Sequence, residues 1–153
     1  MAGAAALGEI GLDRHRGPSL EMQRRYLDRL LELAERYQKP AVFHCVHAVP
    51  ELLAATRGFR PHKLFHGFRG RPELLTELLR HDFFVSFMPD ALERPDLAAF
   101  VKRRGLRRLG FETDDTAETI ECVLARAARQ LELEPEQLIR ATDDNFREFL
   151  NHG

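Results

Sequence analysis

The sequence predicts an α/β fold in which a parallel sheet is built from strands that alternate with helices. Short apolar runs alternate along the chain with segments whose apolar residues recur every three or four positions. Several of these segments open with proline followed by an acidic residue, as the first turn of a helix often does. Such alternation indicates βα units and a parallel sheet. A third observation, an internal repeat of one βα unit, is typical of a barrel.

Five apolar runs are the predicted strands. They are Ala4–Leu7, Ala41–Phe43, Leu64–Phe65, Phe83–Phe87 and Leu106–Phe111. Helical periodicity marks the segments 27–34 and 120–131, and we expect further helices to begin near Pro50, Pro72, Pro95 and Pro135. Ser19 and Asp115 are the residue types that cap helix N-termini, so we expect helices directly after them.

Two of the predicted units are copies of one another. The segment Phe43–Leu53 aligns without gaps on the segment Phe65–Leu75, and the two copies are 22 residues apart. Each copy carries a histidine after an apolar run and the letters PELL at the start of the following helix. The repeat therefore predicts that His44 and His66 occupy equivalent positions on two strands.

Composition limits the class of protein. The chain has 153 residues, enough for a core, and we expect one domain over residues 1–153. Its formal net charge of -1 gives no global attraction to nucleic acid or membrane, so any phosphate-binding surface must be local. No apolar run is long enough to span a bilayer, so we expect no membrane partner.

The two cysteines, Cys45 and Cys122, form no C-x-x-C pair and fit a reducing compartment. The first seven residues lack the basic region of a signal peptide. We therefore expect a cytoplasmic protein.

Four of the predicted strands are followed by a side chain that can bind a metal ion. In a parallel array the carboxyl ends of the strands lie on one face, where catalytic groups from several strands gather. Imidazoles combined with carboxylates suit Zn²⁺ or Mn²⁺, and suit Mg²⁺ less well. The four residues expected to converge are Glu9, His44, His66 and Asp114.

Each of these residues also has a structural interpretation. A histidine at a strand end is more often a hydrogen-bonded structural residue than a ligand, and Glu9 could belong to a salt bridge. Asp114 could cap the helix that follows it. Four such coincidences at four strand ends nevertheless favour a metal site.

Short motifs in the same order resemble those of the TatD-like metal-dependent hydrolases. Together they span the chain from about Gly8 to Leu150. The matching segments are Gly8–Asp13 (GEIGLD), Lys39–Cys45 (KPAVFHC), His66–Gly70 (HGFRG), Phe111–Asp114 (FETD) and Asn145-Phe146.

The resemblance implies a TIM-type (β/α) barrel of the metal-dependent hydrolase kind, with one or two divalent metal ions (Zn, Mn or Mg). It also implies hydrolysis of phosphodiesters, often of DNA, by a metal-activated water. Carried over to this sequence, Glu9 binds or bridges the metals and takes part in catalysis. His44 and His66 bind one metal. Asp114 binds the other or handles the nucleophilic water, which makes it the second catalytic residue.

The sequence departs from the family pattern at its start. The family opens with a strand bearing H-x-H, which supplies two further ligands, and no such motif precedes Glu9. A full barrel takes ~250 residues, and we count about five strands where eight are needed. The sequence therefore predicts an incomplete barrel.

Two other functions remain open. The first is a catalytically impaired fragment or a metal-binding subunit that needs a partner to complete the barrel. The second is a hydrolase of another small substrate, such as an amide or a lactone, because the fold does not fix the chemistry.

Two expectations concern binding partners. Arg14, Arg69 and Arg71 follow strand ends, so we expect them to contact the phosphates of DNA or of a small phosphodiester, although an isolated surface arginine often has no such role. An incomplete barrel would leave the first strand, Ala4–Glu9, at an open edge. Open edges invite pairing with another chain, so we expect a homo-oligomer.

Overall fold

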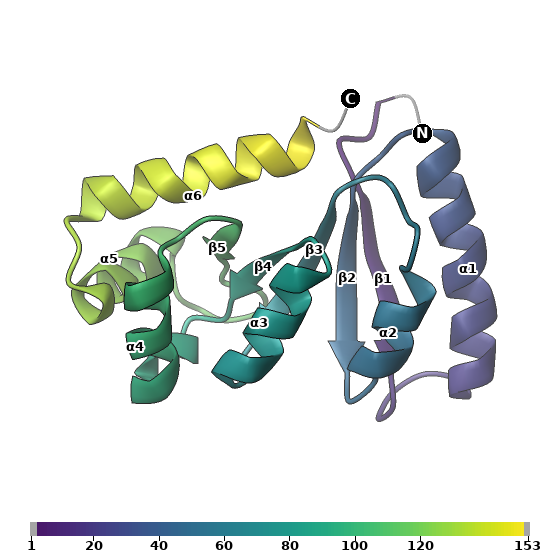
Figure 1. Ribbon diagram of the computed structural model, residues 1–153, viewed down its shortest axis with the longest axis horizontal. Helices are drawn as coiled ribbons and strands as arrows, with labels where there is room; N and C mark the ends of the chain where they lie inside the picture. Colours follow the sequence, from purple (N-terminus) through teal and green to yellow (C-terminus); the bar gives the residue numbers. More distant parts are fainter. Residues whose placement is uncertain (1–2, 152–153) are drawn as a thin grey trace.

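In a computed structural model, the strands of the chain form one parallel sheet and lie in it in the order of the sequence (Figure 1). The structure describes residues 3–151. Within these residues the sheet does not close from its last strand to its first, so the predicted incomplete α/β barrel is confirmed. The strands are β1 (Leu7–Asp13), β2 (Ala41–Val46), β3 (Lys63–Phe68), β4 (Phe83–Phe87) and β5 (Leu109–Phe111).

Helices connect the strands and complete the chain. They are α1 (Leu20–Arg36), α2 (Val49–Ala55), α3 (Pro72–Arg80), α4 (Pro95–Arg104), α5 (Ile120–Leu131) and α6 (Pro135–Leu150), with a 3₁₀ turn, η1 (Ala91–Glu93), before α4. The predicted helix starts at prolines are confirmed, with α2 beginning one residue before Pro50. Ser19 caps α1 by accepting from Met22 N. The cap expected at Asp115 is wrong: a turn closed by Thr113 O and Thr116 N delays α5, and Thr119 caps it.

The strands differ in extent from the apolar runs. β1 begins at Leu7 rather than Ala4 and continues to Asp13, because alanine is a poor strand former while Ile10 and Leu12 bury alternate side chains. β5 begins at Leu109 rather than Leu106, because Leu106 O closes a turn on Leu109 N. β2 and β3 each extend three residues past their apolar runs. The metal-capable residues of β1, β2 and β3 therefore lie inside strands rather than beyond their ends.

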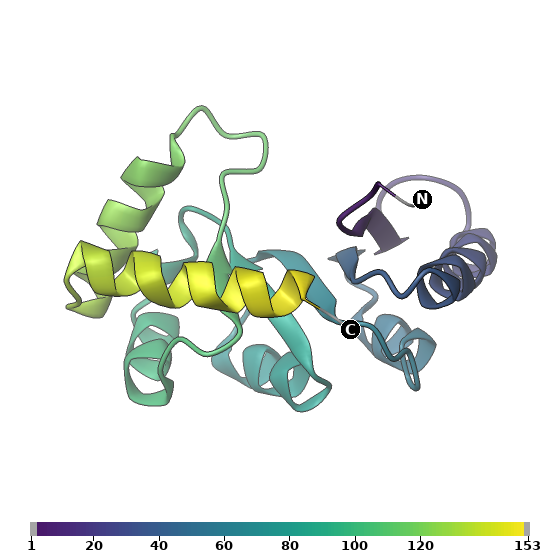
Figure 2. The same ribbon diagram turned by 90° about the horizontal axis from the view of Figure 1, so that it is seen from above.

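The two faces of the sheet have different partners. Side chains alternate along a strand, so Phe43 and Phe65 point to one face while Val42 and His44 point to the other. The first face carries the core: Phe43, Phe83 and Phe87 are fully buried together with helix leucines such as Leu52. Helices α1 to α4 cover this face, so His44 belongs to the opposite, inner face of the curved sheet (Figure 2).

Helix α6 runs across the end of the sheet at which the strands begin (Figures 1 and 2). Its buried Asn145 donates from Nδ2 to Leu106 O at 2.6 Å and to Leu109 O at 2.8 Å. Its Oδ1 accepts from Arg108 N at 3.0 Å. Three main-chain groups around the start of β5 are thus satisfied by one side chain, which fixes α6 to the sheet.

Two glycines let β1 approach β2 closely. Ile10 pairs with Phe43 and Gly11 with His44, but Leu7 pairs with Ala41, so the register slips by one residue around Gly8 and Glu9. A Cβ at Gly8 would lie 2.7 Å from the Val42 Cβ. Gly11 has φ +155°, and a Cβ there would lie 1.8 Å from the His44 carbonyl oxygen. The slip and the two glycines set the position of Glu9 and Asp13 against β2.

We predict that Gly11→Ala destabilises the protein by roughly 3 kcal/mol or more, because the new Cβ overlaps main-chain atoms that have no room to move. Urea unfolding measures the change. Gly110→Ala on β5 is the matched control, since its Cβ would meet nothing nearer than the Ser86 Cβ at 4.0 Å. Equal stability of the two variants would contradict the close approach of β1 to β2.

Candidate metal centre

Two histidines face each other from neighbouring strands. Val42 pairs with Leu64 and Phe43 with Phe65, so His44 follows beside His66. His44 Nδ1 and His66 Nε2 are 3.2 Å apart. Glu9 Oε2, from β1, lies 3.0 Å from the same His66 nitrogen. One ligand atom from each of the three residues lies within 4.8 Å of the others.

The outer nitrogen of each histidine contacts a carboxylate. His44 Nε2 lies 3.1 Å from Asp13 Oδ2, and His66 Nδ1 lies 3.4 Å from Glu112 Oε2. The hydrogen bond with His44 lowers the pKa of Asp13. Burial opposes ionisation of Glu112, but hydrogen bonds with His66, Gly67 and Ser86 outweigh it and lower the pKa of this carboxyl. Both groups are therefore ionised near neutral pH.

This pairing decides which ring nitrogens carry protons. An ionised carboxylate only accepts hydrogen bonds, so the facing nitrogens must be N–H donors. In the neutral rings, His44 Nδ1 and His66 Nε2 then present lone pairs toward one another and toward the Glu9 carboxylate. Three converging acceptors repel one another unless a cation or a proton lies among them. The donor set thus fits a divalent metal ion, whose histidine ligands usually donate their other N–H to a carboxylate or carbonyl.

A proton competes with the metal ion for the ligand nitrogen of His66. The hydrogen bond with Glu112 raises the pKa of His66, and the charges of Glu112, Glu9 and Asp114 act in the same direction. A metal ligand must be deprotonated, so acid opposes metal binding. The apparent affinity for metal should accordingly fall as the pH falls through the raised pKa of His66.

The role of Glu112 was not predicted from the sequence. Its Oε1 accepts hydrogen bonds from Gly67 N and, at 2.8 Å, from Ser86 Oγ, while Oε2 faces His66. In the sequence, this role is indicated only by the position of Glu112 directly after a strand, where its side chain points to the same inner face as His66. Asp13 is the corresponding carboxylate for His44.

Asp114 lies apart from the three convergent residues. It is exposed, in the loop after β5, with φ 47°. Among residues 3–151, the group of ligand atoms within 4.8 Å contains Glu9, His44 and His66 but not Asp114. The charge of Asp114 nevertheless reaches His66, whose pKa it helps to raise. The structure therefore brings three of the four predicted ligands together and leaves the fourth at the rim.

Two of the three predicted substrate-binding arginines already have partners. Arg14 pairs with Glu51 and donates from Nε to His47 O at 2.7 Å. Arg69 pairs with Asp90 at 2.8 Å. Arg71 is exposed at the N-terminus of α3. The first two would have to exchange a carboxylate for a phosphate in order to bind substrate.

Two cavities adjoin the convergent residues. One, of about 430 Å³, lies inside the open barrel between Glu9, His66 and Glu112 and the apolar side chains of α5 and α6, such as Leu124 and Phe146. The other, of about 410 Å³, lies on the β1 side and is lined by Glu9, His44 and the loop that follows Asp13. The convergent residues are thus accessible from two directions.

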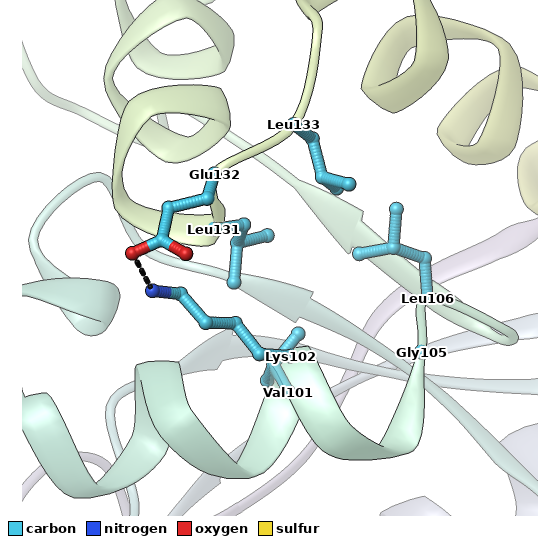
Figure 3. A pocket seen from close by; sticks show the side chains of 7 residues that line it. All are labelled: Val101, Lys102, Gly105, Leu106, Leu131, Glu132 and Leu133. Atoms are coloured by element: carbon cyan, nitrogen blue, oxygen red, sulfur yellow. Dashed lines mark hydrogen bonds and ion pairs between the residues drawn. The ribbon is translucent and has the colours of Figure 1, made fainter.

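A third cavity, of about 380 Å³, shares no lining residue with the two that adjoin the convergent residues (Figure 3). It is bounded by the ends of α4 and α5, close to where β5 begins, and is crossed by an ion pair between Lys102 and Glu132 at 2.7 Å. It holds none of the convergent histidines and carboxylates. Its lining residues are Val101, Lys102, Gly105, Leu106, Leu131, Glu132 and Leu133.

Cys45 directly follows His44 but offers no thiolate. Burial raises the pKa of its thiol to about 11. The thiol is therefore protonated at neutral pH, and the local ligand set is imidazole and carboxylate.

Fold and site together define a class of protein: an open (β/α) barrel whose inner face carries a histidine and carboxylate group suited to a divalent metal. A model of the family described as TatD related DNase matches residues 2–151, and the chain belongs to this family. Within the described residues, no helix is both long and apolar enough to cross a membrane.

Curated relatives carry deoxyribonuclease names. Human "Deoxyribonuclease TATDN3" is 31% identical over 118 residues, which cover 73% of this chain and 43% of the relative. Mouse "Putative deoxyribonuclease TATDN3" has the same identity and coverage of this chain, and 40% of its own length is covered. The chain thus spans less than half the length of these two relatives.

Solved structures confirm the fold. A hydrolase TatD family protein from Entamoeba histolytica superimposes with a TM-score of 0.84 at 18% identity, covering 99% of this chain and 65% of the other. YJJV, a TatD homologue from Escherichia coli K12, gives 0.80 at 23% identity, covering 95% and 63%.

We predict that Glu112→Gln weakens zinc binding by roughly 10- to 100-fold, because the amide no longer provides a charged acceptor for His66 Nδ1–H. Competition with a chromophoric chelator measures the affinity. Glu118→Gln is the matched control, since Glu118 pairs with Arg126 and lies outside the convergent group. Unchanged zinc affinity in Glu112→Gln would show that Glu112 does not support the ligand.

Proposed function

We propose that the protein is a divalent-metal-dependent hydrolase of phosphodiesters, with DNA as its substrate. The observation that supports this proposal best is the convergence of Glu9, His44 and His66, with each outer histidine nitrogen paired to an ionised carboxylate. A bound divalent metal would neutralise phosphate charge and lower the pKa of a water molecule so that it attacks at neutral pH.

The residues at the proposed site would have different roles. His44 Nδ1, His66 Nε2 and a Glu9 oxygen would hold the metal, and nitrogen and oxygen donors of this kind suit Zn²⁺ or Mn²⁺. Three protein ligands leave a position open for water or substrate. Asp114, exposed at the rim, would accept a proton from the attacking water or contribute to a second metal position. Glu9 is more than half exposed, with 51% of its side-chain surface accessible, so it too can reach substrate.

DNA as substrate is supported by the names of the relatives and by the open cavities on both sides of the convergent residues. The net charge of -1 requires that phosphate binding be local. We propose that Arg14, Arg69 and Arg71 contribute to it. Phosphate contacts position a nucleic acid without reading its sequence, so these arginines would fix the strand and not select bases.

We predict that the protein hydrolyses bis(p-nitrophenyl) phosphate in Mn²⁺ or Zn²⁺ and that His66→Ala lowers the rate at least ~100-fold, because it removes one of three metal ligands. Asp114→Ala should reduce the rate while leaving most of the bound metal, because Asp114 lies outside the convergent group. Initial rates and metal content of each purified variant test this.

His62→Ala is a control for loss of a histidine, since His62 contacts the α6 carbonyl of Phe149 and lies outside the convergent group. Metal binding without hydrolysis would favour the alternative, a metal-binding subunit that needs a partner to complete the barrel. Absence of metal binding would refute the proposed function.

We further propose that the protein self-associates through β1, which has only β2 as a partner among residues 3–151. The two free cysteines, Cys45 and Cys122, support our proposal of a reducing compartment, the cytoplasm.

Sedimentation velocity should show concentration-dependent dimers of the wild-type protein. Leu7→Lys should shift them to monomers, because lysine on an edge strand opposes strand pairing. Tyr26→Lys, on an exposed position of α1, is the control and should leave the dimers unchanged. A monomer at all concentrations would contradict this proposal.

A further inference from the structure

Gln23 of α1 forms an unusual set of hydrogen bonds with the loop after β1. Its Oε1 accepts from Asp13 N at 2.7 Å, and its Nε2 donates to Asp13 O at 2.8 Å. The same Nε2 lies 2.8 Å from Pro18 O and 3.1 Å from Arg16 O. One side-chain amide thus contacts both ends and the middle of the segment 13–18.

The Asp13 groups that Gln23 contacts belong to the open edge of the sheet. β1 pairs only with β2 in the described part of the chain. The next residue, Arg14, donates its N–H to Val46 O at 3.1 Å and so faces β2. Adjacent residues of a strand direct their N–H and C=O groups to opposite sides, which leaves those of Asp13 facing away from β2. Gln23 offers one donor and one acceptor there, as a neighbouring strand would.

With its main chain held in this way, Asp13 has little freedom in its side chain. Oδ1 accepts hydrogen bonds from His15 N at 2.7 Å and from Arg16 N at 3.0 Å. Oδ2 remains for His44 Nε2, at 3.1 Å. The loop that supplies the two N–H groups is the same loop that Gln23 binds. Both the position and the rotation of the Asp13 carboxylate therefore depend on Gln23.

We propose that Gln23 is a positioning residue for the metal ligand His44, acting through Asp13. Gln23 fixes Asp13, Asp13 holds the proton of His44 on Nε2, and the Nδ1 lone pair is thereby directed at His66 and Glu9. This inference rests on the proposed metal site, yet it also makes a statement about the metal-free protein: the tautomer of His44 depends on a residue that His44 does not touch.

The first experiment is a double-mutant cycle with Zn²⁺ as the probe. Gln23→Leu, which keeps the volume and removes all four hydrogen bonds, should weaken zinc binding about 10-fold, the lower end of the range for supporting residues. Asp13→Ala should weaken it at least as much. The double variant should bind zinc no more weakly than Asp13→Ala alone, because residues that act through one another are not additive. Additive losses would overturn the proposal.

A second measurement needs no metal. Long-range ¹H–¹⁵N spectra of the imidazole rings, recorded above the ordinary pKa of histidine, should show His44 protonated on Nε2 in the wild-type protein. Gln23→Leu should give a mixture of the two tautomers. A wild-type tautomer together with wild-type zinc affinity in Gln23→Leu would overturn the proposal. If the wild-type protein binds no zinc but the tautomer still shifts, the proposed metal function fails while the positioning role stands.

Controls separate positioning from stability. Gln137→Leu removes a hydrogen bond of the same kind, from Glu134 N to the Gln137 side chain at the start of α6. It should lower the melting temperature without changing zinc affinity or the His44 tautomer. If Gln23→Leu does not fold, Gln23→Glu retains the acceptor for Asp13 N and loses the donors. Gln23→Glu should also weaken zinc binding and give a mixture of His44 tautomers, each to a smaller or equal degree. Wild-type zinc affinity together with the wild-type tautomer in this variant would overturn the proposal.

Discussion

The arrangement of the inner face depends on the contact of two ionised carboxylates with the outer nitrogens of two histidines. Asp13 and Glu112 hold protons on His44 Nε2 and His66 Nδ1, so that the opposite nitrogens present lone pairs only 3.2 Å apart. Without these carboxylates, either ring could carry its proton on the inner nitrogen instead. His44 Nδ1 and His66 Nε2 would then form an ordinary hydrogen bond with one another. Selection of one tautomer in each ring is therefore what turns two neighbouring histidines into a cation site.

The spacing of parallel strands accounts for the convergence itself. The sequence repeat between the units of β2 and β3 has an offset of 22 residues, and the strands pair in the same register, Ala41 with Lys63 and Phe43 with Phe65. Equivalent residues on neighbouring strands lie about 4.8 Å apart, close enough for their side chains to share one ion. The two histidines meet because the repeat and the sheet register coincide, and no loop is needed to bring them together.

This coincidence explains why part of the site was predictable from the sequence. The α/β class, the helix starts at proline and the equivalence of His44 and His66 all follow from local patterns or from the repeat. The supporting role of Glu112 depends instead on contacts across 45 or more residues, with Gly67 and His66. The slip at Gly8 and Glu9 depends on how closely β1 meets β2, which no local pattern records. Asp114 belongs to a loop, whose course the strand pattern does not determine.

β1 differs from the other ligand-bearing strands because it lies at the edge of the described sheet. β2 and β3 have neighbours on both sides, and regular pairing suffices to place their histidines. Glu9 and Asp13 have a neighbouring strand on one side only. The register slip and the two closely approaching glycines lie around them, and the Gln23 side chain makes hydrogen bonds to Asp13 of the kind a second strand would make. A side-chain amide can make the hydrogen bonds that one residue of a neighbouring strand would make, but it cannot supply the apolar contacts of a whole strand. Glu9, which has no such support and is half exposed, is therefore the least constrained of the three proposed ligands.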